Sequence, residues 1–229
     1  MSAKVFVSYD DTANDRDALA LGRLLGETGA ELTLVYVRHA HEADAAREQV
    51  EQNAAAELLQ RGALALGAAD ARQLVVTHPS TGEGLLQLAE REGADVVVFG
   101  SDYRTPPGAV QPGTSAARLL DGGAVAVAIA PAGLHRRLET LVTRIGVLAE
   151  RDDAAPDQTA RSLAEALDAE VVPADGSVDL LVIGSRPEAR AGQLALSASG
   201  THALETAEGA VVALPRGRAV AFDGRHVLA

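Results

Sequence analysis

An internal repeat constrains the fold of this chain more than any other feature of its sequence. When the sequence is aligned with itself at an offset of 84 positions, residues 95–133 match residues 179–217 without a gap. Both segments contain an apolar strand, Gly-Ser, a loop, a short helix, a second apolar strand and Pro-x-Gly. A second match, at an offset of 142, places residues 10–25 on residues 152–167. The two offsets predict a duplicated unit whose second copy lacks about 58 residues.

The first 130 residues alternate short apolar runs with amphipathic stretches. Strands are predicted at 5–9, 32–37, 73–77, 96–99 and 124–130. Helices are predicted at 15–28, 41–66, 83–92 and 115–120. Because strands that alternate with helices favour parallel pairing, we expect an α/β fold with a doubly wound, open parallel sheet of the Rossmann-like kind.

The repeat divides the chain into a complete module over 1–133, a linker over 134–143 and a truncated second module over 144–229. The linker is expected to expose His135, Arg136 and Arg137. In the second module, the predicted elements are strands at 145–149, 171–172, 180–183 and 210–214, a helix at 156–167, and a ribbon at 218–228 around Asp223-Gly224.

The composition excludes several classes of function. The 32 acidic residues outnumber the 20 basic ones, and the net charge of −12 disfavours binding to nucleic acid or to an anionic membrane. The absence of cysteine excludes disulfides, thiol catalysis and thiolate metal sites, so a cytoplasmic protein is expected. No apolar stretch is long enough to span a bilayer, and the first residues do not resemble a signal peptide.

Enzymatic motifs are weak. His39 and His41 lie near two acidic residues, but this spacing is more typical of a solvated surface than of a metal site. No histidine has serine and acidic partners at a spacing that indicates a hydrolase. The sole lysine, Lys4, excludes a lysine-bearing phosphate loop. We therefore expect neither a metal site nor a catalytic residue.

One group of residues could bind an anion. Gly100 follows the fourth strand, and Gly113-Thr114-Ser115 opens a short helix whose free N–H groups suit a phosphate. Asp10 follows the first strand, so it is expected at the same carboxyl edge of the sheet. In a second interpretation the glycines only shape the loop, and Thr114 or Ser115 caps the helix. Both interpretations remain open at this point.

Several of these segments together resemble the universal stress protein family. They are Val7-Ser8-Tyr9-Asp10, Tyr36-Val37, Asp95 to Ser101, Gly113-Thr114 and Pro131. ATP-binding members of that family carry Gly, two residues, Gly, nine residues and then Gly-Ser or Gly-Thr. Here that frame falls on Gly100, Tyr103, Gly113 and Thr114, so Tyr103 replaces the second glycine. The resemblance covers residues 4–131 and, in truncated form, 144–215.

The resemblance implies positions for a nucleotide. Asp10 and Val37 would flank the adenine and ribose. The phosphates would be surrounded by residues of the glycine frame, namely Gly100, Gly113, Thr114 and Ser115. Arg104 occupies a position where the family often has a basic residue. In the second copy the frame falls on Gly184, Pro187, Ser197 and Ala198, so binding is expected in the first module only.

The implied function is a stress-response regulatory protein that binds or senses ATP, with Mg²⁺, without catalysis. The alternative is a protein–protein interaction module of the same fold, with its pocket closed by Tyr103 and by the loop prolines, Pro106, Pro107 and Pro112. Modules of the family pair through the edge strand after the nucleotide loop. We therefore expect 124–130 to lie beside 210–214 as an intramolecular pseudo-dimer, with a homodimer of chains left open.

Overall fold

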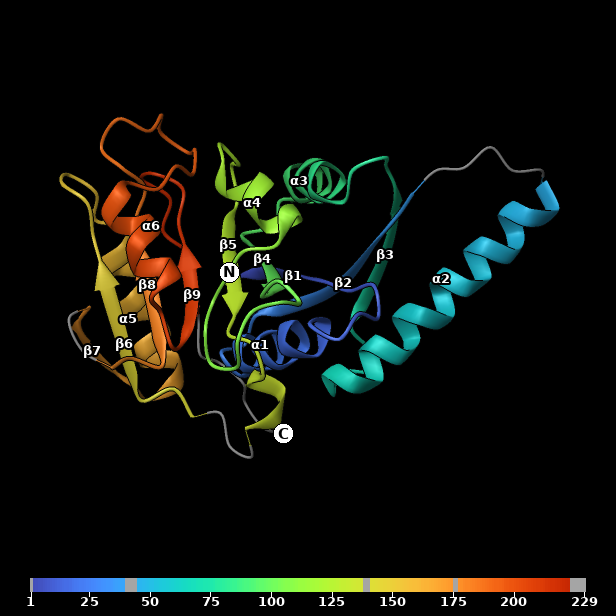
Figure 1. The fold of residues 1–229 in the computed structure, drawn as a ribbon, viewed down its shortest axis with the longest axis horizontal. Coiled ribbons are helices and arrows are strands. Elements are labelled where there is room, and N and C mark those ends of the chain that lie inside the picture. Colours follow the sequence, from blue (N-terminus) through green and yellow to red (C-terminus); the bar gives the residue numbers. More distant parts are fainter. Residues whose placement is uncertain (1, 40–44, 138–140, 175–176, 223–229) are drawn as a thin grey trace.

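The computed structural model describes residues 2–39, 45–137, 141–174 and 177–222, and within them the strands form one nine-stranded sheet (Figure 1). The strand order is β3-β2-β1-β4-β5-β9-β8-β6-β7. Every neighbouring pair is parallel except β5 and β9, which are antiparallel. The predicted doubly wound, mostly parallel α/β sheet is therefore confirmed.

The first five strands and four helices make up the first half of the sheet. The strands are β1 (Lys4–Ser8), β2 (Glu31–Arg38), β3 (Arg72–Thr77), β4 (Val96–Gly100) and β5 (Ala126–Ala130). The helices are α1 (Asp15–Glu27), α2 (Ala45–Leu66), α3 (Thr81–Glu92) and α4 (Thr114–Leu120). Helices α1 and α2 pack on one face of the sheet, whereas α3 and α4 pack on the other. The predicted boundaries agree with these elements to within a few residues.

The second half repeats this arrangement with fewer elements. A short helical turn, η1 (Leu134–Arg136), precedes it. Its strands are β6 (Arg144–Leu148), β7 (Glu170–Pro173), β8 (Leu180–Ile183) and β9 (Ala210–Ala213), and its helices are α5 (Ala155–Leu167) and α6 (Ala198–Glu205). By their place in the sheet, β6, β7, β8 and β9 correspond to β1, β2, β4 and β5. Among the described residues, nothing between β7 and β8 corresponds to α2, β3 or α3.

The two halves meet along β5 and β9, as expected for segments 124–130 and 210–214. Ala128 lies opposite Val212 at the centre of the antiparallel pair, and these residues are 84 positions apart. On either side, Val127 lies opposite Ala213 and Ile129 opposite Val211. The junction therefore has the self-complementary register of two subunits related by a two-fold axis.

Hydrogen bonds of the first half recur in the second half at the same offset of 84. The buried Ser101 hydroxyl donates to the Ala130 carbonyl over 2.7 Å and accepts from the Gln111 N–H over 3.2 Å. The same two bonds, of 2.7 and 3.1 Å, join the residues that the repeat places on these three, namely Ser185, Leu214 and Ala195. The repeat found in the sequence thus corresponds to shared local structure.

The second offset predicted from sequence, 142 for residues 10–25, agrees with the packing of α1 and α5. The buried positions 17, 18, 21 and 22 of α1 recur at 159, 160, 163 and 164 of α5. A Cβ on Gly100 would meet Asn14, and a Cβ on Gly184 would meet Pro156, 142 positions further along. The strands before these helices have an offset of 140, because Val5 pairs with Val96 as Ile145 pairs with Leu180. The second half therefore has two additional residues between its first strand and the packed part of its first helix.

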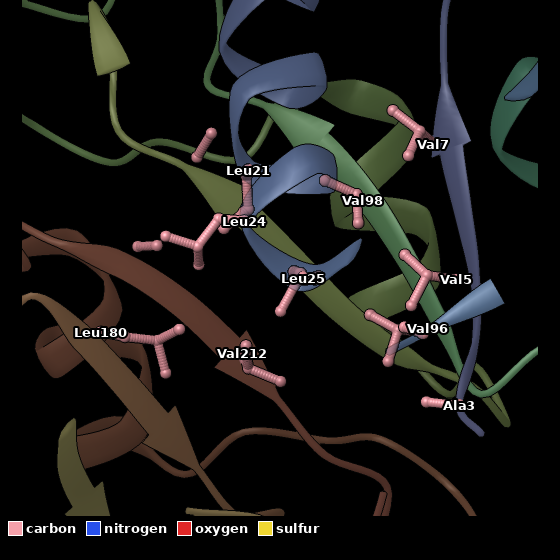
Figure 2. Close-up of a cluster of buried hydrophobic side chains, with 14 of the residues drawn as sticks. Ala3, Val5, Val7, Leu21, Leu24, Leu25, Val96, Val98, Leu180 and Val212 are labelled. Carbon is pink, nitrogen blue, oxygen red and sulfur yellow. The ribbon is translucent and has the colours of Figure 1, made fainter. Parts of the chain in front are cut away.

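One hydrophobic core runs across the junction. Leu24 and Leu25 of α1 belong to the same buried cluster as Leu180 of β8 and Val212 of β9 (Figure 2). This cluster fills the face covered by α1, α2 and α5, whereas a second cluster fills the face covered by α3, α4 and α6. The two halves therefore share a core on each face of the sheet.

A small residue compensates for the absence of a counterpart to α3. Phe6 is buried beneath the α3 face in the first half, and its counterpart in the second half is Gly146. A Cβ on Gly146 would lie 3.0 Å from Val178, which precedes β8. Glycine here lets the connection before β8 cover the sheet in place of a helix.

Two predictions near the ends of the modules need correction. His135 is only partly exposed, because its ring lies against the buried carboxylate of Asp17. The ribbon at 218–228 lies partly outside the described residues, and its described part forms no strand. Instead, Val220 and Phe222 are buried along α5 and donate their N–H groups to Thr159 and Ser162. Hydroxyls on the helix surface thus replace the strand partner that the ribbon would have needed.

Candidate nucleotide site

The strand order reverses between β1 and β4. From β1 the chain proceeds through α1 to β2 on one side, and from β4 it proceeds through α4 to β5 on the other. Ligands of open α/β sheets bind outside the carboxyl ends of the strands at such a point. The topology therefore brings the segments after β1, β2 and β4 to one edge, as the sequence predicted.

Asp10 lies in the loop between β1 and α1. It is exposed, and its carboxylate accepts the N–H of Thr12 over 3.2 Å. Its own N–H donates to Asp15 over 2.7 Å, and Thr12 N–H donates to the same carboxylate oxygen over 3.1 Å. Asp15 thus holds the loop that presents Asp10. Asp15 was not among the predicted site residues, although an acidic residue in a first helical turn is a signal that could have identified it.

The buried position of Asp15 changes its acidity. It is only 7% exposed, and burial together with the neighbouring Asp10 carboxyl raises the pKa of Asp15 to about 7. The adjacent Asp11 has a φ of 66° and accepts hydrogen bonds from Tyr9 and Arg61. These two partners lower the pKa of Asp11. Neighbouring carboxyls in one loop therefore have opposite shifts.

Val37 and Gly100 contribute to packing. The Val37 side chain is buried in β2 beneath α3, close to Gly84, so only its backbone could meet a ligand. Gly100 ends β4 against the backbone of Asn14, and a Cβ at Gly100 would overlap the Asn14 carbonyl. The glycine is needed here because the start of α1 approaches β4 closely.

The loop after β4 is tied to itself and to β5. Asp102 N–H donates to the Gln111 carbonyl over 2.8 Å, and Gly108 N–H donates to Ala132 over 2.8 Å. Arg104 donates its backbone N–H to Asp102 over 3.0 Å and its guanidinium over 3.1 Å, and these two bonds hold the pKa of the Asp102 carboxyl below its usual range. The guanidinium therefore already has a partner within its own loop.

Tyr103 lies at the surface of this loop. The residue is 75% exposed, and the Arg104 guanidinium lies 5.0 Å from the centroid of its ring. Tyr103 also lines a small cavity of 140 Å³ together with Pro107, one of the loop prolines. The ring points outward because the loop turns back toward β5 after Ser101, a contact that the glycine frame alone could not reveal.

Gly113, Thr114 and Ser115 form the start of α4 at the same sheet edge. Gly113 is the N-cap residue with extended backbone, and a Cβ added to it would meet no atom within 4 Å. Thr114 is exposed and Ser115 is partly exposed. The space beside Gly113 is open, whereas the space beside Gly100 is filled by Asn14. The Gly113 end of the frame could therefore accept a ligand.

Comparison with known proteins identifies the family. A sequence model of the universal stress protein family matches residues 1–131, more than half of the 229 residues. The chain belongs to the universal stress protein family. A search of curated proteins gave no significant match.

Solved structures support the same fold over both halves of this universal stress protein. A structure from Pseudomonas aeruginosa UCBPP-PA14 that carries the universal stress protein name covers 94% of both chains at 15% identity, with a TM-score of 0.62. A universal stress protein from Archaeoglobus fulgidus DSM 4304 covers 95% of this chain and 100% of its own at 14% identity, with a TM-score of 0.61. At these identities the likeness shows the fold alone.

A further member was solved in complex with cAMP. It covers 43% of this chain and 75% of its own at 19% identity, with a TM-score of 0.37. The binding of cAMP is therefore stated of that protein alone.

The second half of this universal stress protein holds a carboxylate at the corresponding edge. Glu150, at the position equivalent to Asp10, accepts a hydrogen bond from Ser197, the N-cap residue of α6. Ser197 also lies 2.9 Å from the Ser199 hydroxyl and accepts the Gly200 N–H over 3.0 Å. Ser197 corresponds to Gly113 at the offset of 84. This chain thus provides its own anion at the start of α6.

A further buried pair lies near the start of α1. Asp17, 4% exposed, accepts N–H groups from Gly133 and His135 over 2.8 and 2.9 Å and lies 2.6 Å from Nδ1 of His135. A cavity of 140 Å³ adjoins this pair and Tyr103. These bonds hold residues 133–135, which follow β5, against the start of α1. The pair was missed in the sequence because Asp17 and His135 are far apart in the chain.

Other cavities are larger, and the one of 270 Å³ reaches Pro112, next to Gly113. They have volumes of 520, 510, 280 and 270 Å³, and none of them is lined by Asp10, Gly100 or Gly113. Within the described ranges, no three acidic or histidine side chains are grouped to hold a metal. Of the histidine cluster considered from sequence, His41, Glu42 and Asp44 lie outside the described residues. No helix in the described part is long and apolar enough to cross a membrane.

Proposed function

We propose that this universal stress protein is a stress-response regulator that binds adenine nucleotide, ATP with Mg²⁺, in its first module and does not turn it over. Family membership and the strand-order reversal between β1 and β4 support the proposal. Gly113, Thr114 and Ser115 would meet the phosphates, while Asp10 and the backbone of Val37 would face the nucleoside.

The observation that carries the proposal is the position of Glu150. In the second half, this carboxylate lies against Ser197 at the start of α6, where free N–H groups and the helix dipole favour an anion. Ser197 and Gly113 have almost the same backbone geometry, with φ of −76° and −71° and ψ of 172° in both. The architecture that the two halves share therefore suits a negative charge at this position.

In the first half the same position has no carboxylate from the chain itself among the described residues. Asp10, the counterpart of Glu150, bonds to Thr12 in its own loop instead. Gly113 has no side chain that could occupy the open space beside it. A phosphate of ATP would supply the charge that Glu150 supplies in the second half.

We favour ATP binding over ATP hydrolysis because the described residues at this edge include no activated nucleophile. Asp15 is buried and accepts the N–H groups of Asp10 and Thr12, and the Asp10 carboxylate shares the Thr12 N–H. Within the described residues, neither carboxylate forms a hydrogen bond with the hydroxyl of Thr114 or Ser115. General base catalysis needs such a contact or one bridging water.

Calorimetric titration with ATP and Mg²⁺ tests the proposal. We expect one site per chain, and we expect Gly113→Asp to weaken binding at least tenfold. A carboxylate about 4 Å from a phosphate charge costs from about 1 to about 4 kcal/mol, depending on the local dielectric. Gly113→Asn adds the same bulk without charge and should weaken binding by less than about threefold.

Two results would contradict nucleotide binding at this edge. One is a flat titration of the unmodified chain at millimolar ATP. The other is equal affinity of the Asp and Asn variants, because the bound charge would then lie elsewhere. Both variants place a good N-cap residue before α4 at an extended backbone position, so folding should be preserved.

We also infer a tandem arrangement, with a complete module over 1–133, a linker over 134–143 and a truncated module over 144–229. The hydrogen bonds that recur at the offset of 84 support a duplication. In this arrangement the first module binds the nucleotide, and the second covers the edge of β5.

A further inference from the structure

A groove of 270 Å³ lies between the two halves, on the face of the sheet covered by α4 and α6. The first half contributes Leu120 and Asp121 at the end of α4, and the second half contributes Leu204 and Glu205 at the end of α6. Pockets with apolar walls and a few polar groups at the interface of two units are favoured positions for small molecules.

The lining follows the two-fold relation of the halves. Leu120 and Leu204 are 84 positions apart, as are Asp121 and Glu205, which repeats the relation between the central residues of the β5–β9 junction. Two further pairs with this offset line the groove, namely Pro112 with Leu196 and Ala117 with Thr201. The groove therefore depends on the joining of the two halves at β5 and β9. It runs beside α4 and reaches Pro112, the residue before Gly113, but Gly113 itself does not line it.

Arg186 breaks the symmetry of the groove. It lines the groove from the second half and forms no ion pair with any residue in the described ranges. Its counterpart in the first half is Asp102, which pairs with Arg104 outside the groove. An exposed guanidinium at one wall of the groove is suited to a carboxylate.

The other charges in the groove have the opposite sign. Asp121 and Glu205 form no ion pair within the described part of the chain, and each lies at the C-terminal end of its helix. Carboxylates and helix C-termini both favour a cation. The groove thus presents a positive group and two negative groups around Leu120 and Leu204.

We propose that this groove binds a small zwitterion with an apolar body, of which an α-amino acid with a branched aliphatic side chain is the simplest. Its carboxylate meets Arg186, its ammonium meets Asp121 and Glu205, and its side chain packs on Leu120 and Leu204. At roughly 30 Å³ for each water-sized group, a groove of this volume holds about nine of them, the size of leucine.

Calorimetry with L-leucine and two analogues as probes separates the contributions. The first analogue, 4-methylpentanoate, lacks the ammonium, and the second, 3-methylbutylamine, lacks the carboxylate. We expect L-leucine to bind at least tenfold more tightly than either. Arg186→Gln should weaken leucine binding at least tenfold and leave the amine unchanged. Arg190→Gln is the matched control, because Arg190 is exposed in the same half but does not line the groove.

A variant that fills the groove checks its location. Ala117 is exposed on α4 and lines the groove, so Ala117→Phe should abolish leucine binding while urea unfolding remains cooperative. The proposal is overturned if the unmodified chain binds no leucine at 10 mM, if Arg186→Gln and Arg190→Gln bind leucine equally, or if Ala117→Phe leaves binding intact. ATP titration of the unmodified chain is a separate measurement, so the absence of leucine binding would not contradict the nucleotide proposal.

Discussion

The buried carboxyl group of Asp15 makes the free energy of unfolding depend on pH. Its pKa is about 7 in the folded chain, against 3.8 for an unperturbed aspartate. Between these values the folded chain holds a proton that the unfolded chain releases. The contribution of Asp15 to stability is therefore present in full below about pH 4 and is lost as the pH rises through about 7.

Asp15→Asn removes this titration and keeps an oxygen that can accept the N–H groups of Asp10 and Thr12. We expect the variant to be more stable than the unmodified chain at pH 8, by about 2 kcal/mol, because no buried charge then faces Asp10. At pH 4 the two should be nearly equal. Urea unfolding at both values measures the difference.

Asp11→Asn is the control for this experiment. Asp11 is exposed and its pKa is lowered, so the variant should not gain stability at pH 8. If Asp15→Asn and the unmodified chain lose stability in parallel between pH 4 and 8, Asp15 does not titrate in this range.

The Asp17 carboxylate leads to a second prediction for a single residue. It accepts N–H groups from Gly133 and His135 and lies against the His135 ring. We expect Asp17→Ala to lower the free energy of unfolding by about 3 kcal/mol, because buried donors lose their acceptor. His135→Ala retains the two backbone bonds and should cost about 1 kcal/mol. Equal losses in denaturant unfolding would show that the backbone bonds contribute little.

At the scale of elements, the glycines at the two ends of the β4–α4 connection have different roles. We expect Gly100→Ala to cost about 3 kcal/mol or more, because the new Cβ would overlap the backbone at the start of α1. Gly113→Ala should cost less than about 1 kcal/mol, since its Cβ meets open space and only the N-cap preference changes. Thermal unfolding compares the two, and similar losses would rule out the close approach of α1 to β4 as the reason for Gly100.

The order of the elements could be predicted because apolar runs and amphipathic stretches depend on the sequence alone. The strands 96–100 and 180–183 are fully buried on both faces, so their runs of valine, leucine and isoleucine were unambiguous. The register of the second half was not predictable from matched residues, because it depends on pairing between strands that are distant in sequence. The offset of 142 holds for the helices, whereas the strands before them have an offset of 140.

The candidate site was predicted only in part for the same physical reason. Gly113, Thr114 and Asp10 were correctly assigned to one edge, since parallel strands share their carboxyl ends. The roles of Gly100 and Tyr103 depend on what each one meets, which is the Asn14 backbone for the first and solvent for the second. Contacts of this kind, like that between Glu150 and Ser197, require the folded chain.

For the whole molecule, the register of the β5–β9 junction predicts the behaviour of the isolated first half. A fragment of residues 1–137 would leave β5 as an exposed edge strand. We expect it to form dimers through β5, with Ala128 opposite Ala128, because the junction already has a self-complementary register. Light scattering after size-exclusion chromatography measures the mass, and a fragment that stays monomeric at about 100 µM would contradict this pairing.

The junction between β5 and β9 has a further consequence for how the molecule assembles. Only three residue pairs join the strands, whereas a stable complex of separate subunits usually buries about 1,000 Å² or more. A short connection holds the two edges at an effective concentration in the millimolar range, so their association does not depend on how much protein the cell contains. Dilution cannot separate the two halves. Because each half is encoded once, a substitution in one half is not repeated in the other, as it would be in a dimer of identical subunits.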